Sequence, residues 1–282
     1  MYETYYKLSG RPFQLNPDPR FFFSSRGHGR ALAYLVYGVH QGEGFIVITG
    51  EIGAGKTMLA RALVRNIKSE KLLLASVVST SLEPGDVLRM VACEFGLRPE
   101  ENKALLIKQI EEFLLAGQQQ GKRALLLVDE AQNLPVASLE ELRMISNFGH
   151  ADMPLLQTFL LGQPEFRLTL RSSELAQFRQ RIIASCHLGP LDAGETKAYI
   201  LHRLQTVGWR GDPSFSSDAY EAIHSHTNGI PRKINLLCDR LMLMGSLDAK
   251  HDFTATEVNQ VIGELREEFA FAELAPDQEG IR

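Results

Sequence analysis

The stretch Gly50-Glu51-Ile52-Gly53-Ala54-Gly55-Lys56-Thr57 follows an apolar run at residues 44–50 and precedes a stretch with apolar residues at helical spacing as far as Ile67. This order predicts a buried strand, a glycine-rich loop and a helix in direct succession. Glycines let successive backbone N–H groups face one phosphate, and the start of the helix adds the positive end of its dipole. We therefore expect residues 50–57 to bind the phosphates of a nucleotide.

Two side chains of this loop have the chemistry that such a site needs. The Lys56 ammonium can reach the β- and γ-phosphates of ATP, and the Thr57 hydroxyl is a suitable Mg²⁺ ligand. With ATP and Mg²⁺ as the expected ligands, the predicted contacts of this segment are Gly50, Gly53, Ala54, Gly55, Lys56, Thr57 and Met58. The alternative is an ordinary glycine-rich turn before a helix, which the strand–loop–helix context disfavours.

A pair of carboxylates ends the apolar run at residues 123–129, where Asp129 is followed by Glu130. The carboxyl ends of the strands are where open α/β sheets bind ligands. We expect Asp129 to hold Mg²⁺ through its water shell and Glu130 to orient and polarise the attacking water. An acid at position 130 favours hydrolysis over transfer to a bound substrate. A strand that merely ends in solvated acids is the alternative.

Short apolar runs alternate with helical patterns along the first two thirds of the chain, which is typical of an α/β protein with a largely parallel sheet. The predicted strands are residues 44–50, 72–78, 123–129, 155–162 and 182–191. From Asp192 onward only helices are expected, two of them starting with capping boxes, Asp192 with Glu195 and Thr254 with Glu257. The length of 282 residues fits two domains, and we place their boundary near residue 190.

Composition excludes several classes of protein. With 44% hydrophobic residues and a net charge of −4, the chain is neither disordered nor basic enough to bind nucleic acid by charge alone. The last twenty residues hold six acids and two bases, a balance of −4, so residues 1–262 sum to zero. No apolar run approaches the roughly 18–20 residues that span a bilayer, and the N-terminus lacks a secretory signal pattern. Cys93, Cys186 and Cys238 fit isolated thiols in a reducing compartment, so a cytosolic protein is expected.

Three weaker signals lie further along the chain. Gln163 ends the fourth predicted strand, where it could sense a γ-phosphate or position water, although a simple turn before Pro164 is an alternative. Arg179 and Arg181 precede the last strand, and either could reach the nucleotide of a neighbouring subunit as an arginine finger; a solvated surface pair is the alternative. Arg232 begins a helix after Pro231 and could turn back onto the phosphates, or it could be an ordinary surface arginine.

These motifs, in this order, resemble those of an AAA+ ATPase. The N-terminal segment PFQLNPDPRFFF, together with VDEAQNL, LLGQPEF, HLGPLDAGETKAYI and GIPRKINLLCDRL, further resembles ATPases of the general secretion pathway protein A type. Within that group the chain is most similar to the secretion ATPase associated with exosortase and exopolysaccharide gene clusters. The similarity covers about residues 1–265.

The resemblance implies a P-loop fold with a five-stranded parallel sheet and a C-terminal helical lid. It implies a nucleotide-binding domain at residues 1–190 with an N-terminal strap at 1–27, a lid at 191–268 and an acidic, flexible tail at 269–282. Part of the strap, residues 13–23, is expected near the adenine. By position, Gln163 would be sensor 1, Arg232 sensor 2 and Arg181 the preferred finger, with Arg179 kept open.

The same resemblance implies a homo-oligomeric ring or filament with ATP at subunit interfaces. Our main hypothesis is an ATP-driven motor or switch for export or assembly of envelope polysaccharide or protein. Longer members carry a membrane anchor and a cell-wall-binding domain; this chain shows neither, so we expect a partner to recruit it to the inner membrane. The alternatives are a DNA-handling ATPase, which the neutral charge of the body disfavours, and a nucleotide-dependent scaffold with negligible turnover.

Overall fold

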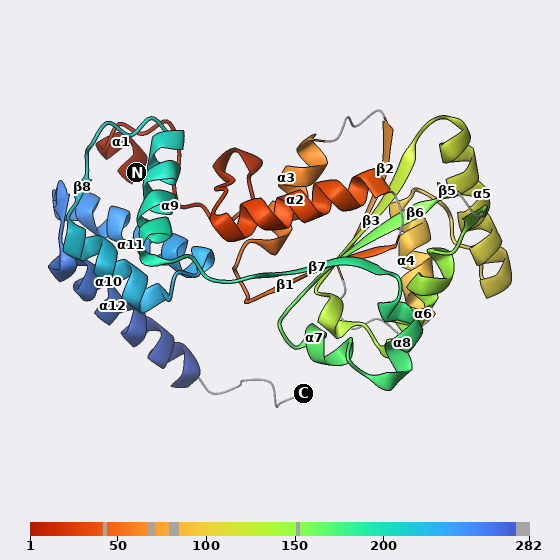
Figure 1. The fold of residues 1–282 in the computed structure, drawn as a ribbon. Helices are drawn as coiled ribbons and strands as arrows, with labels where there is room; N and C mark the ends of the chain where they lie inside the picture. Colours follow the sequence, from red (N-terminus) through yellow and green to blue (C-terminus); the bar gives the residue numbers. More distant parts are fainter. Residues whose placement is uncertain (42–43, 67–70, 79–84, 151–152, 275–282) are drawn as a thin grey trace, which may run out of the picture. The chain divides into compact units, whose positions relative to one another are not determined.

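The computed structural model describes residues 1–41, 44–66, 71–78, 85–150 and 153–274 (Figure 1). The chain divides into two compact units. The α/β unit is Ser24–Gly189, and the helical unit combines Met1–Phe23 with Pro190–Arg282. The division therefore falls between Gly189 and Pro190, but the first 23 residues lie in the helical unit and not in the nucleotide-binding domain, where we had expected them.

The α/β unit is built on one five-stranded parallel sheet, as the sequence predicted. Its strand order is β2-β3-β6-β1-β7. These strands are β1 (Phe45–Gly50), β2 (Leu72–Val78), β3 (Arg123–Asp129), β6 (Leu156–Gly162) and β7 (Ile182–Leu188). Every residue of the inner strands β1 and β6 is buried, because helices cover both faces of a parallel sheet. The order also brings the carboxyl ends of β3, β6 and β1 side by side.

Alternating side chains of β1 face two different helical layers. Phe45 and Val47 belong to an apolar core with helices α4 (Asp86–Glu94), α5 (Lys103–Gln119) and α6 (Val136–Ile145). Ile46 points the other way, where Gly38 of α2 (Arg26–Gln41) comes so close that an added Cβ would lie 1.8 Å from its Cδ1 atom. Helix α3 (Lys56–Asn66) packs beside α2 and against β1. Short elements complete the unit: η3 (Ala131–Asn133), β4 (Gly149–His150), β5 (Met153–Pro154), α7 (Phe166–Thr169), η4 (Ser173–Leu175) and α8 (Ala176–Arg179).

The helical unit contains α9 (Ala193–Thr206), α10 (Ser217–Thr227), α11 (Pro231–Leu247) and α12 (Ala255–Leu274). The predicted capping box at Asp192 is confirmed, because its side chain accepts from the Glu195 N–H while the Glu195 side chain accepts from the Asp192 N–H. At the second predicted box, Glu257 accepts from the Thr254 N–H, but the Thr254 hydroxyl accepts from the Thr256 N–H, one position earlier than expected.

The N-terminal segment, with α1 (Tyr2–Tyr5) and η1 (Pro19–Phe21), packs in this unit because its aromatic side chains are buried there. Phe13 is fully buried and Phe21 is 4% exposed, both in the core that α9 and α11 form. The side chain of Arg203 on α9 donates to the carbonyl oxygens of Pro12 (2.5 Å) and Gln14 (3.0 Å). Apolar burial and hydrogen bonds thus attach the segment to the helices.

Two further expectations are corrected. Helices alone do not make up the chain after Asp192, because β8 (Ser214–Phe215) and β9 (Asp252–Phe253) form a parallel pair through backbone hydrogen bonds. Two-residue strands leave no periodic pattern in the sequence. Helix α12 continues to Leu274, so residues 269–274 of the expected flexible tail are helical, and the rest of that tail lies outside the described residues.

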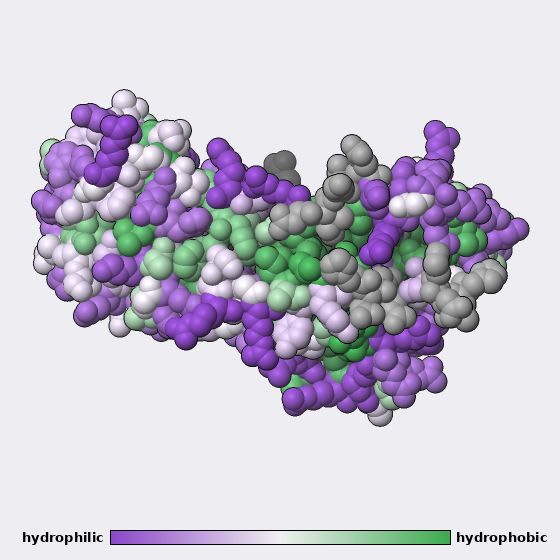
Figure 2. Space-filling model, turned by 45° about the horizontal axis from the view of Figure 1, so that its top comes forward, coloured by the Kyte–Doolittle hydropathy of each residue, from purple (hydrophilic) through white to green (hydrophobic). Residues whose placement is uncertain are grey.

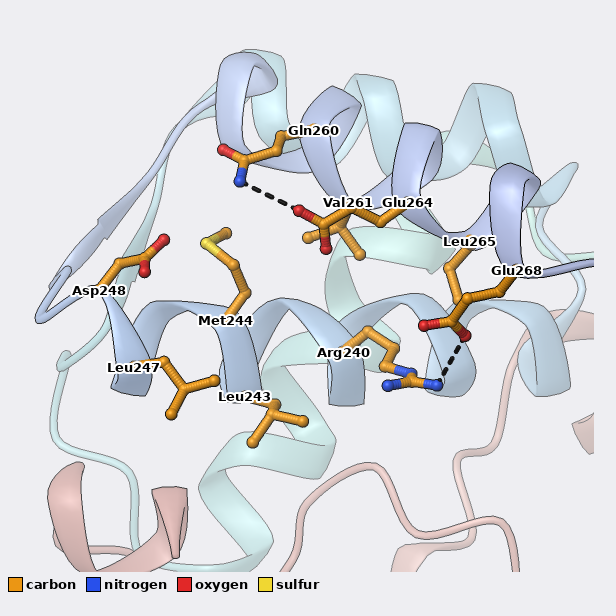
Figure 3. A pocket seen from close by; sticks show the side chains of 10 residues that line it. All are labelled: Arg240, Leu243, Met244, Leu247, Asp248, Gln260, Val261, Glu264, Leu265 and Glu268. Carbon is orange, nitrogen blue, oxygen red and sulfur yellow. Dashed lines mark hydrogen bonds and ion pairs between the residues drawn. The ribbon is translucent and has the colours of Figure 1, made fainter.

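A groove of about 300 Å³ lies between α11 and α12 (Figure 3). Leu243 and Leu247 of α11 line it opposite Glu264 and Glu268 of α12, and Glu268 accepts a hydrogen bond from Arg240. On the face that Figure 2 shows, hydrophilic and apolar side chains are interspersed over the helical unit. Within the described part of the chain, no helix combines the length and apolar character that crossing a membrane requires.

Candidate functional site

The loop between β1 and α3 has the backbone of a phosphate-binding loop. Gly53 (φ 83°) and Gly55 (φ 97°) lie in the left-handed region, which glycine adopts without a steric penalty. Gly50 has no room for a side chain, since a Cβ there would lie 2.7 Å from the carbonyl oxygen of Leu188. The loop leads into the first residue of α3, Lys56, so the positive end of the helix dipole meets it. This backbone fits the phosphates of a nucleotide.

Lys56 is turned onto its own loop. Its Nζ atom donates to the carbonyl oxygens of Gly50 (2.8 Å) and Glu51 (3.1 Å), and the residue is only 6% exposed. Burial lowers the pKa of the ammonium, while the nearby carboxylates of Glu130 and Asp129 act to raise it. Two backbone carbonyls thus hold the positive charge at the phosphate loop. The two carboxylates lie near the ammonium without forming a salt bridge to it.

Thr57 and Asp129 form the pair that a magnesium ion would use. The Thr57 hydroxyl, at the second position of α3, donates to Oδ2 of Asp129 at the end of β3 over 2.6 Å. The other oxygen, Oδ1, accepts from the Glu130 N–H at 3.0 Å. A hydroxyl and one carboxylate suit Mg²⁺, which keeps several waters and uses few protein ligands. Among the described residues, no cluster of three His, Cys, Asp or Glu side chains is placed to ligate a metal.

Glu130 is held by two glutamines. Its backbone lies in the left-handed region (φ 54°, ψ 39°), an unfavourable conformation for a non-glycine residue and one that often occurs at active sites. Its Oε2 atom accepts from Nε2 of Gln132 (2.6 Å) and Nε2 of Gln163 (3.2 Å). The Gln163 N–H in turn donates to Oε1 of Gln132 at 2.9 Å. Hydrogen bonding, first from Gln132, lowers the pKa of Glu130, so this carboxylate stays ionised.

The structure therefore brings most of the candidate residues together in the α/β unit. Gln163 contacts Glu130, and Met58 is half-buried in the first turn of α3. Gln132 is an addition that the sequence reasoning missed, although it stands only three positions after Asp129 in the VDEAQ stretch. The hydrogen bond from Gln132 to Glu130 forms next to the left-handed backbone of Glu130, which no sequence motif predicts.

The arginines have different environments. Arg179 donates to the carbonyl oxygens of Leu170 (2.8 Å) and Ser172 (2.5 Å), so its guanidinium is committed to its own unit. Arg181 is exposed just before β7, and its guanidinium makes no hydrogen bond or ion pair within the described part of the chain. Arg232 is exposed at the second position of α11 and thus belongs to the helical unit.

A buried histidine of α2 also contacts the loop, although no sequence motif predicts this contact. His28 is 6% exposed, and its Nε2 atom lies 3.0 Å from the carbonyl oxygen of Ala54. Its Nδ1 atom lies 2.8 Å from the hydroxyl oxygen of Ser25. Because 26 residues separate His28 from Ala54, only the packing of α2 in the fold brings them together.

A parallel sheet of order β2-β3-β6-β1-β7, a phosphate loop after β1 and an Asp-Glu pair after β3 define a P-loop nucleotide-binding fold. Residues 39–170 match the family model described as the AAA domain, so this part of the chain is an AAA domain. Its expected fold class is thereby confirmed.

The chain is 38% identical over 261 residues to General secretion pathway protein A of Aeromonas hydrophila. The match covers 92% of this chain and 47% of the relative, so the chain spans about half the length of that protein. The similarity that the sequence motifs indicated is confirmed.

Two solved structures share the fold. The Aeropyrum pernix ORC2 protein in its ADPNP–ADP complexes is 18% identical, with a TM-score of 0.70 over 90% of this chain and 71% of that one. The Aeropyrum pernix ORC1 protein in complex with DNA is 13% identical, with a TM-score of 0.68 over 90% of this chain and 69% of that one. At these identities the likeness establishes the fold alone.

Proposed function

We propose that this protein is a Mg²⁺-dependent ATPase that works as a homo-oligomer and drives or switches an envelope-associated secretion or exopolysaccharide export system. The observation that carries the proposal is the grouping of Lys56, Thr57, Asp129 and Glu130 around the phosphate loop. The donor set fits a nucleotide with its metal, and a complex with ADPNP and ADP is known for a protein of the same fold.

In this proposal the loop N–H groups and Lys56 bind the phosphates, with Lys56 exchanging the carbonyls of Gly50 and Glu51 for phosphate oxygens. Thr57 and Asp129 hold the metal, which when bound neutralises charge that develops on the phosphates. Glu130, kept anionic by its glutamine partners, accepts a hydrogen bond from the attacking water and orients it. A lowered pKa suits orientation better than full proton abstraction, which favours a pKa near the working pH.

Assembly would complete the site. Arg181 is the arginine we assign as the finger toward a neighbouring subunit, because it is exposed and uncommitted in the described part of the chain, whereas Arg179 is bound to two carbonyls. Arg232 on the helical unit would be sensor 2, and Gln163 would be sensor 1 through its contact with Glu130. A finger of this kind contributes a factor of roughly 10³–10⁵ to turnover.

The cellular role rests on similarity. The name of the Aeromonas hydrophila relative, General secretion pathway protein A, supports a secretion pathway, and the exopolysaccharide assignment rests on the motifs quoted above. We propose that the protein is cytoplasmic and that a protein partner recruits it to the inner membrane. A fold-mate bound to DNA makes DNA handling the second candidate, to be tested by salt-sensitive duplex binding at sub-micromolar protein.

The experiment that tests catalysis is phosphate release by wild type and Glu130→Gln, with binding of a fluorescent ATP analogue measured separately. We expect the variant to bind nucleotide but to lose turnover by at least about 10²-fold. Undiminished turnover would remove Glu130 from the mechanism. Mixing Arg181→Ala with Lys56→Ala subunits should then recover turnover, since each supplies what the other lacks; no recovery at any ratio contradicts a finger acting in trans.

A further inference from the structure

Beside the phosphate loop, His28 makes a self-consistent set of hydrogen bonds. A carbonyl oxygen can only accept, so the Nε2 atom of His28 carries the hydrogen that it shares with Ala54 at 3.0 Å. The Nδ1 atom is then free to accept from the Ser25 hydroxyl at 2.8 Å, and the same hydroxyl oxygen accepts from the His28 N–H at 3.2 Å. The Ala54 carbonyl thus fixes the tautomer, and Ser25 helps to hold the direction of the ring.

The peptide that His28 contacts precedes a glycine with a left-handed backbone. It joins Ala54 to Gly55, and Gly55 stands at φ 97°, in a region where glycine moves freely between conformations. In a trans peptide the C=O and N–H groups point in opposite directions. A hydrogen bond that fixes the Ala54 carbonyl toward His28 therefore fixes the Gly55 N–H away from it. Rotation of this peptide would reverse that N–H.

The contact is also close. A Cβ added at Gly55 would lie 2.9 Å from the Nε2 atom of His28, so the ring fills the space beside this glycine. His28 and Ser25 are 6% and 5% exposed, which shields the bond to Ala54 from competing water. Position 55 is thus restricted to glycine by its φ angle and also by the histidine.

We propose that His28 is a positioning residue of the nucleotide site, which holds the Ala54–Gly55 peptide so that the Gly55 N–H is directed at a bound phosphate before the nucleotide arrives. The inference rests on the proposed nucleotide site and adds a residue of α2 to it. Preorganised donors avoid the cost of ordering the loop upon binding. His28 acts through the backbone of Ala54 and Gly55, so its effect falls on affinity and not on the water-orienting group Glu130.

The test compares His28→Ala with His28→Gln, whose side-chain amide can still donate to the Ala54 carbonyl. Loss of one hydrogen bond predicts about 3- to 10-fold weaker binding of both ATP and ADP by His28→Ala. The KM for ATP should rise by the same factor, with kcat changed less than about 2-fold, and His28→Gln should restore most of the affinity. His226→Ala, an exposed histidine of the helical unit, is the matched control and should bind as wild type.

Fluorescent ADP and ATP analogues, titrated well below the unfolding temperature, separate positioning from mere stabilisation. If the role of His28 is purely structural, His28→Ala will lower the melting temperature of nucleotide-free protein and leave the affinity for nucleotide as in wild type. That result overturns the proposal. So does a His28→Gln variant that binds no better than His28→Ala. If His28→Ala is unfolded, the comparison of His28→Gln with Ser25→Ala decides, because Ser25→Ala releases the ring and should weaken binding.

The outcomes also distinguish this inference from the proposed ATPase function. Wild-type protein that binds nucleotide in a His28-dependent way but releases no phosphate would leave the positioning role standing and overturn hydrolysis. If wild-type protein hydrolyses ATP but His28→Ala binds nucleotide with unchanged affinity, the ATPase function stands and the positioning role of His28 is overturned. No nucleotide binding by wild type at all would overturn both.

Discussion

The Nζ atom of Lys56 lies 2.8 Å from the carbonyl oxygen of Gly50, so the lysine of the phosphate loop is bonded to the loop that carries it. A second carbonyl, that of Glu51, accepts from the same atom at 3.1 Å. A carbonyl oxygen can give up the ammonium to a phosphate more easily than a carboxylate could, because a carboxylate adds the attraction of a full negative charge to the hydrogen bond. The arrangement stores a buried positive charge next to the place where phosphates are expected.

Replacing Lys56 with Met should therefore separate nucleotide binding from stability. Methionine keeps the length of the side chain and removes a charge whose burial is unfavourable, but it also leaves the carbonyls of Gly50 and Glu51 without this donor. The two effects oppose each other, so nucleotide-free protein should melt close to the wild-type temperature. Binding of ATP should weaken by about 10²-fold or more, since hydrogen bonds to charged groups contribute about 1.5–3 kcal/mol each. The measurement is thermal melting with and without ATP and Mg²⁺. Lys108→Met, on the exposed face of α5, is the control; equal ATP-induced stabilisation in both variants would contradict the role of Lys56.

Replacing Gln132 should shift the pH dependence of turnover. Its hydrogen bond is the first cause of the lowered pKa of Glu130. In the proposed mechanism the ionised form of this carboxylate orients the attacking water. Turnover should then fall as the pH drops through the pKa of Glu130. Gln132→Ala raises that pKa toward its ordinary value, so the acid limb of the profile should move to higher pH. Profiles measured between about pH 4 and 8 check this, with Asn133→Ala as the neighbouring control; superimposable limbs in the two variants would argue against it.

Local order in the chain explains what the sequence could and could not predict. The strand, loop and helix around Lys56 are consecutive, and Asp129 ends a continuous apolar run, so periodicity and motif spacing locate both. Gln132 and His28 had no such signal, because one depends on the left-handed backbone of Glu130 and the other on packing of α2. Contacts between distant segments are set by tertiary structure, which also attached residues 1–23 to the helical unit.

Arg203 should decide whether the N-terminal segment stays attached. Besides its bonds to Pro12 and Gln14, its guanidinium donates to the Tyr199 hydroxyl at 2.8 Å and lies 4.6 Å from the Phe21 ring centre. Arg203→Met would leave two carbonyls without their donor and should destabilise the attachment by about 2–4 kcal/mol. Arg203→Lys should recover only part, because an ammonium lacks the planar fork that reaches several acceptors. Hydrogen exchange of residues 8–23 is the measurement; equal protection in wild type and Arg203→Met would refute the attachment.

Glu257 gives the helical unit a stability that depends on pH. Its carboxylate accepts from Nζ of Lys250 (2.6 Å) and from the N–H and hydroxyl of Thr254 (2.9 and 2.6 Å). The hydrogen bond from Lys250 is the first cause that lowers the pKa of Glu257 from 4.5 to about 2. Because the pKa of Glu257 is lower in the folded than in the unfolded state, its ionised carboxylate stabilises the folded protein at pH values above the unfolded-state pKa. This contribution is lost as the pH falls from about 5 to 2.

Glu257→Gln should thus be less stable than wild type at pH 7 and nearly equal to it at pH 2. Because the Lys250 side chain is 39% exposed, we expect a difference of only about 1 kcal/mol at pH 7, well below what the full pKa shift would imply. Thermal unfolding followed at pH 7, 4 and 2 checks the trend. Glu264→Gln is the matched control, since the Glu264 carboxylate accepts only from Gln260 among the described residues and should show no such dependence. A constant difference between wild type and Glu257→Gln at all three pH values would show that the stabilisation does not come from the charge of Glu257.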